Sequence, residues 1–135
     1  MNGLAMIEYM PREFIMLNKN KRTMEVYVEA GAYARLMTDI GVKAAVAMSK
    51  VLPAKESDRL VVLLNRIGEI KCKADDQLFR DYPDLGNEGT DVFYGTLRDG
   101  PRNKLDEEVI RKANSLIVEL MDTMEGKEHE RTGDY

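Results

Sequence analysis

Three stretches of the chain repeat apolar residues at the spacing of an amphipathic α-helix. They cover about residues 30–52, 54–81 and 105–125. Side chains three or four positions apart lie on the same face of a helix, so each stretch would present an apolar stripe. The pattern predicts a mainly α fold, a small bundle of three principal helices.

The first stretch is the most apolar of the three. Its charged residues are mostly confined to a stripe of Arg35, Asp39 and Lys43, and small residues such as Gly41 and Ala44 would let another backbone approach. A helix this apolar must be covered on most sides. We interpret it as the central helix of the bundle or as part of a dimer interface. The chain also contains nine methionines, a residue that suits adaptable interfaces. The apolar helix and these methionines together predict a homodimer.

Prolines and glycines place the ends of these helices. Pro53 ends the first helix and can open the second, which predicts an antiparallel pair. Pro83 ends the second helix. Gly126 is a natural stop for the third. We therefore predict a single helical domain over residues 1–126, followed by a flexible C-terminal tail over residues 127–135.

The segment before the first helix alternates apolar and polar residues. Met24, Val26 and Val28 alternate with polar or charged neighbours, which is typical of a half-buried strand. A second apolar run, residues 14–17, lies across a polar turn. We favour an N-terminal β-hairpin over residues 12–28, with a helix that begins near Thr23 as the competing interpretation.

Length and composition narrow the class of protein. A chain of 135 residues suits one domain, and a single cysteine allows no intramolecular disulfide. Neither a signal peptide nor a continuous apolar span is recognisable, so we expect a cytoplasmic protein without a membrane segment. Net charge is −4, and residues 53–135 hold 19 Asp and Glu against 13 Lys and Arg. This balance makes nucleic acid an unfavourable partner.

Few patterns in the chain carry catalytic chemistry. Cys72 and the only histidine, His129, are too few ligands for zinc, and no phosphate-binding glycine loop is present. Glu119, Asp122 and Glu125 share a helix face, where a facing acidic pair could complete a magnesium site, but the second helix offers no such pair. We predict no cofactor, metal or catalytic residue. A small metal-dependent enzyme on a nucleotide or metabolite, with a site shared between subunits, remains the alternative.

Residues 75–97 combine acidic side chains, turn residues and four of the nine aromatics of the chain. Acidic residues can steer a basic partner while aromatics provide buried anchors. The competing interpretation is a solvated helix end followed by a turn, with the aromatics tucked under the bundle. The predicted partner-binding residues are Asp75, Asp76, Phe79, Tyr82, Asp84, Glu88, Phe93 and Tyr94.

These residues lead to a functional prediction. We expect a small protein-binding regulator, adaptor or inhibitor that acts through an acidic and aromatic surface. Size and simplicity favour a bacterial, phage or mobile-element protein. A DNA-binding regulator is a further alternative, which the acidic balance of the chain disfavours.

Overall fold

The computed structural model describes the backbone of residues 14–133 and the side chains of residues 14–123. Its long helices are α2 (Met24–Ser49), α3 (Ala54–Asp81) and α4 (Lys104–Gly133), and two short 3-10 turns are η1 (Lys19–Lys21) and η2 (Gly86–Gly89). The described part of the chain contains no strand. The prediction of a mainly helical chain with three principal helices is therefore confirmed.

The predicted N-terminal hairpin is wrong, because its second strand belongs to α2. Thr23 is the N-cap residue of that helix, and its side-chain hydroxyl accepts a hydrogen bond from the backbone N–H of Val26 at 3.4 Å. Tyr27, Val28 and Gly31 are buried together on one helical face. Residues 24–28 fit both the alternation of a strand and the spacing of a helix. The Thr23 cap and the packing of this face select the helix.

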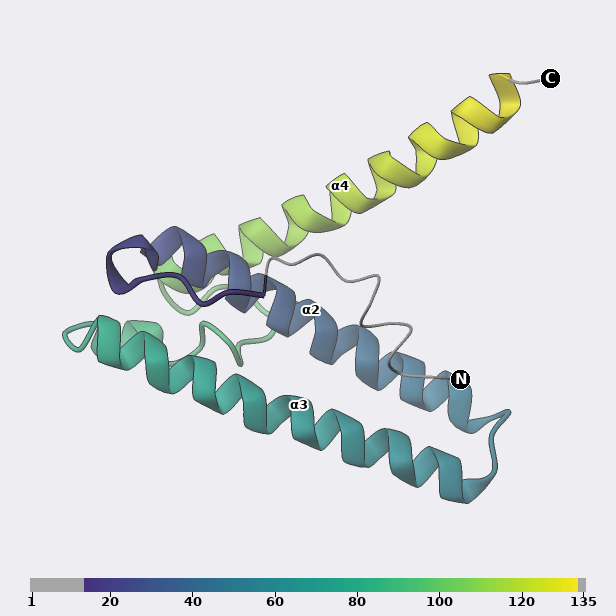
Figure 1. Ribbon diagram of the computed structural model, residues 1–135, viewed down its shortest axis with the longest axis horizontal. Coiled ribbons are helices and arrows are strands. Elements are labelled where there is room, and N and C mark those ends of the chain that lie inside the picture. Colours follow the sequence, from purple (N-terminus) through teal and green to yellow (C-terminus); the bar gives the residue numbers. More distant parts are fainter. Residues whose placement is uncertain (1–13, 134–135) are drawn as a thin grey trace.

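Helices α2 and α3 form an antiparallel pair joined at Pro53 (Figure 1). Gly41 permits close packing between them, because a Cβ atom there would lie 2.7 Å from a methyl group of Leu64. Lys71 of α3 donates a hydrogen bond to the Thr38 hydroxyl of α2 at 2.9 Å. Helix α2 also packs against α4, so it lies between the other two helices.

Helix α4 begins with a side-chain cap and extends further than the sequence predicted. Asn103 Oδ1 accepts a hydrogen bond from the backbone N–H of Asp106 at 2.8 Å, which satisfies a donor of the first turn. The helix continues through Gly126 to Gly133. The glycine expected to stop it is therefore an interior residue, and the predicted start of the tail falls inside the helix.

The apolar core lies at one end of the molecule. Buried residues from the N-terminal half of α2, the end of α3, residues 82–103 and the first half of α4 meet there: Tyr27, Val28, Ala32, Ala34, Leu78, Val92, Phe93, Leu105, Val109, Ala113 and Leu116. Beyond this core, α4 departs from the α2–α3 pair and extends away from it (Figure 1). None of the described helices has the length and apolarity needed to cross a membrane.

Candidate functional site

The chain between α3 and α4, residues 82–103, is attached to α2 by one buried arginine. The Arg35 side chain is 1% exposed. Its guanidinium donates to the carbonyl oxygens of Val92 at 3.1 Å, of Thr96 at 3.4 Å and of Asp91. It also forms an ion pair of 2.7 Å with the Asp106 carboxylate of α4. Arg35 therefore joins α2, this connection and the start of α4.

Two glycines let the connection approach α2 this closely. A Cβ atom at Gly31 would lie 2.4 Å from the carbonyl oxygen of Val92. A Cβ atom at Gly95 would lie 2.6 Å from the guanidinium of Arg35. Both distances are below van der Waals contact, so any side chain at either position would push the connection away from the helix.

A second polar network fixes the end of α3 to the start of α2. Arg22 pairs with Asp81 at 2.7 Å, the Tyr27 hydroxyl donates to the same carboxylate, and the Tyr82 hydroxyl donates to the carbonyl of Arg22 at 3.0 Å. Hydrogen bonds from Arg22 and then Tyr27 hold the pKa of Asp81 well below its usual range. Burial, and next the Asp81 carboxylate, raise the pKa of Tyr27 to about 12.

Three of the four predicted aromatic residues pack inward. Phe93 is 2% exposed and meets Tyr27 edge to face, with ring centroids 6.5 Å apart. Tyr82 meets Tyr27 in the same geometry at 6.0 Å. Phe79 is half-buried beside η2, where a Cβ atom on Gly89 would lie 3.3 Å from its ring. These rings therefore support the connection.

Tyr94 is the aromatic residue of the predicted set that faces outward. Its side chain is 44% exposed. The Lys71 ammonium lies 4.9 Å from the centroid of its ring, within the range of a cation–π interaction. Burial, followed by the positive charge of Arg35, lowers the pKa of Lys71. The ring is thus held in place on one side and open to solvent on the other.

The predicted acidic residues differ in their surroundings. Asp75 is half-buried beneath the surface, and burial, followed by the charge of Asp76, raises its pKa. Asp76, Asp84 and Glu88 are exposed, and among the described residues none of them takes part in an ion pair. Three of the four predicted carboxylates are therefore exposed and outside the ion pairs of the described residues.

Neighbouring acidic residues of the same region have internal partners instead. Asp81 pairs with Arg22, Asp106 with Arg35, and Asp91 with Arg102 at 3.5 Å. We name the exposed set of Asp76, Asp84, Glu88 and Tyr94 the connection face. The sequence pointed to all four members, but it did not separate them from the residues that support the connection.

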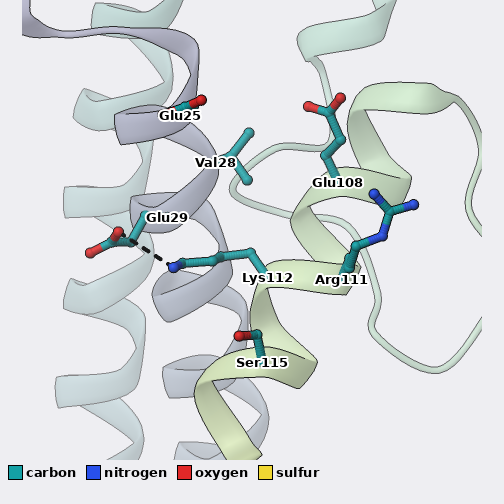
Figure 2. Close-up of a pocket in the computed structure, with 7 residues that line it drawn as sticks. All are labelled: Glu25, Val28, Glu29, Glu108, Arg111, Lys112 and Ser115. Atoms are coloured by element: carbon teal, nitrogen blue, oxygen red, sulfur yellow. Dashed lines mark ion pairs between the residues drawn. The ribbon is translucent and has the colours of Figure 1, made fainter. Parts of the chain in front are cut away.

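A charged pocket of about 560 Å³ lies between α2 and α4. Figure 2 shows Glu25 and Glu29 on α2 and Glu108 and Lys112 on α4, with Lys112 and Glu29 joined by an ion pair of 3.7 Å. Three glutamates and two basic side chains line it. Within the part of the chain that the structure describes, no three His, Cys, Asp or Glu side chains converge to hold a metal ion. The pocket therefore offers mixed-charge contacts.

A second hollow between the same two helices, about 480 Å³ in volume, is largely apolar. We name it the α2–α4 groove. It is lined by Tyr33, Leu36, Met37, Ile40, Leu116, Ile117, Glu119, Leu120 and Thr123. Glu119, one of the three acidic residues predicted to share a helix face, is the charged residue of this groove. The side chain of Glu125, another of the three, lies outside the described residues. The sequence predicted apolar stripes on both helices, but not that the helices would diverge along them.

Comparisons with known protein families, with curated protein sequences and with solved structures found no match for this chain. Geometry and chemistry alone therefore define the two candidate surfaces. The connection face is acidic, with one aromatic ring. The α2–α4 groove is largely apolar and lies between α2 and α4.

Proposed function

We propose that the protein binds another protein, as a small regulator, adaptor or inhibitor, and that the connection face is its contact surface. One observation carries the proposal. The connection of residues 82–103 is fixed to α2 by the buried Arg35, yet Asp84, Glu88 and Tyr94 stay exposed on it. Asp76, the fourth member of the set, is exposed on α3.

The length and support of the connection favour a binding role. Loops longer than about 12–15 residues are uncommon in compact domains and are often functional. Binding residues concentrate on loops that a rigid scaffold positions. Here the scaffold consists of Arg35, Phe93 and the network around Asp81, so the exposed residues are held ready for a partner. Their negative charge favours a partner with a basic surface.

The alternative of a small enzyme has weaker support. An enzyme of the predicted kind requires carboxylates that converge in a pocket. In the charged pocket of Figure 2, Glu29 is already paired with Lys112. The exposed apolar side chains of α2 and α4 favour protein contacts instead.

The free thiol of Cys72 is exposed, which suits a reducing compartment such as the cytoplasm.

Paired charge-neutralising variants test the connection face. The partner is first captured from the native host with the wild-type protein and identified by mass spectrometry. Binding rates are then measured for Asp84→Asn/Glu88→Gln and for the control Asp58→Asn/Glu69→Gln, which removes the same two charges from exposed positions on α3. We expect slower association for the first variant only, and a smaller difference at high salt because exposed charges are then screened.

A ring variant tests the anchor on the same face. Tyr94→Ala should speed dissociation by an amount that corresponds to about 2 kcal/mol or more, as expected for a hot-spot residue. Tyr94→Phe keeps the ring over Lys71 and should retain most of the affinity. Thermal unfolding must first show that the variants fold. If neither the acidic pair nor the ring changes either rate, residues 75–97 are only a connection between helices.

A further inference from the structure

We propose that two copies of this chain interlock, with the C-terminal half of α4 from each copy lying in the α2–α4 groove of the other. The inference is independent of the connection face. It starts from the divergence of the helices. Ile40 on α2 and Leu120 on α4 both line the groove, and both are 61% exposed. In a single chain, no described element covers them.

The two sides of the groove match in length. On α2, the helix runs from the first groove residue, Tyr33, to its end at Ser49, and on α4 it runs from the first groove residue, Leu116, to its end at Gly133. At a rise of 1.5 Å per residue, each arm is about 25 Å long. An α4 arm from a second copy could therefore lie along the whole exposed length of α2.

The exposed apolar area on the arms approaches what a dimer requires. Seven large apolar side chains on these arms are about half exposed: Tyr33, Met37, Ile40, Met48, Ile117, Leu120 and Met121. At about 25 cal/mol per Å², the usual gain from completely burying an aliphatic side chain corresponds to roughly 60–120 Å² of apolar surface. Because each of the seven is only about half exposed, together they offer on the order of 200–400 Å² per copy. A standard interface buries about 800 Å² per partner, a little over half of it apolar.

Charge and symmetry favour a second copy over a different protein. Residues 36–70, the far end of the α2–α3 pair, hold five Lys and Arg against four Asp and Glu, whereas residues 116–133 of α4 hold two against five. An acidic α4 arm therefore meets the weakly basic end of the α2–α3 pair. In a two-fold dimer each contact is made twice, so both grooves are filled by the same exchange. The resulting assembly would surround each α2–α3 pair with a third helix.

A matched pair of isoleucine variants tests the dimer. Sedimentation of the full chain across a dilution series should show a dimer for the wild type. Ile40→Asp should raise the dimer dissociation constant about 100-fold or more, because it places an unpaired charge in the interface. The control Ile70→Asp adds the same charge on α3, where the side chain is 67% exposed and lines a different hollow. It should stay dimeric. A monomeric wild type, or equal weakening by both variants, would overturn the proposal.

A mixing experiment tests the reciprocal exchange itself. Leu120→Lys should also be monomeric alone, since it charges the α4 arm. A mixture of Ile40→Asp and Leu120→Lys should form a heterodimer, because the pairing of α2 with the partner's α4 is then unmodified on one side and places Asp beside Lys on the other. Circular dichroism on each variant confirms that the helices remain. A mixture that stays monomeric, although both variants are folded, would contradict the pairing of α2 with the partner's α4.

Discussion

The two ends of this molecule use the same kind of apolar stripe with opposite results. The closed end is the end that contains the core, formed by the N-terminal half of α2, the end of α3, residues 82–103 and the first half of α4. There, Ala32, Val109 and Ala113 are completely buried. In the open end, formed by residues 36–70 and by α4 beyond Leu116, Ile40 and Leu120 are mostly exposed. Periodicity identifies which face of a helix is apolar. It does not identify what covers that face, which depends on where the helices meet.

Polar contacts hold the closed end together as much as apolar contacts do. Residues 82–103 lie over α2 because Arg35 binds three of their carbonyl groups and the Asp106 carboxylate. Buried backbone carbonyls without partners would be costly. In the described residues of the open end, no buried arginine makes a comparable set of hydrogen bonds. The apolar side chains of that end remain available for association.

Removing the arginine should have the largest effect on this contrast. Arg35→Met leaves the Asp106 charge buried without its ionic partner and removes the side-chain donor from the carbonyls of Val92 and Thr96. The Asp91 carbonyl keeps the backbone N–H of Gly95 as a donor. We expect the free energy of unfolding to fall by about 3–5 kcal/mol, a large share of the stability of a small domain. Urea denaturation measures the loss. The control Arg66→Met removes an exposed arginine from α3 and should change stability by about 0.5 kcal/mol or less. Equal effects of the two variants would show that Arg35 does not hold the closed end together.

Two glycine variants should then shift stability in opposite directions. Gly31→Ala places a methyl group 2.4 Å from the Val92 carbonyl oxygen, so the connection must move, at a cost of about 1–3 kcal/mol. Gly68→Ala meets no atom within 4 Å on α3. It should stabilise the helix by about 0.5–1 kcal/mol, since alanine restricts the unfolded chain. Thermal or urea unfolding distinguishes the signs, and a stabilising Gly31→Ala would contradict the tight packing of the connection.

The smallest expected effect concerns pH and the network around Asp81. Because the folded chain lowers the pKa of this carboxyl, folding favours its ionised form. That contribution is complete above the ordinary pKa of an aspartate, about 3.9, and declines as pH falls below it toward the folded-state value. We expect wild type to be more stable than Asp81→Asn at pH 7 and to lose this advantage in acid. Urea unfolding between pH 7 and pH 2 measures the difference in stability between the two proteins. A difference that does not change with pH would show that the charged pair does not cause it.

Much of the helical framework could be predicted from the sequence. The second predicted helix, residues 54–81, coincides with α3 because prolines frame a strong stripe. The start of α2 corresponds to the competing interpretation and not to the favoured hairpin, since Met24 to Val28 satisfy both periods and only the Thr23 cap and buried neighbours decide between them. Gly126 did not end α4: glycine weakens a helix by only about 1 kcal/mol relative to alanine, so it does not by itself stop one.

The candidate site was less predictable because it depends on tertiary contacts. Phe93 and Tyr94 are adjacent and similar in sequence, yet one lies in the core and the other faces solvent. The sequence places Arg35 in a charged stripe with Asp39 and Lys43. A signal did exist: Arg35 follows Val28 by seven positions and Gly31 by four, which places it on the buried face of α2. The sequence alone did not show which acceptors it would meet there.

Hydrogen–deuterium exchange at several protein concentrations tests the central claim most directly, because it compares the closed and open ends within one sample. Amide protection in residues 27–35 and 105–115 should be high and independent of concentration, since a single chain completes that core. Protection in residues 39–49 and 117–133 should rise with concentration as the open arms are covered by a second copy. Protection that is the same at both ends, or unchanged by concentration in the open arms, would contradict the account.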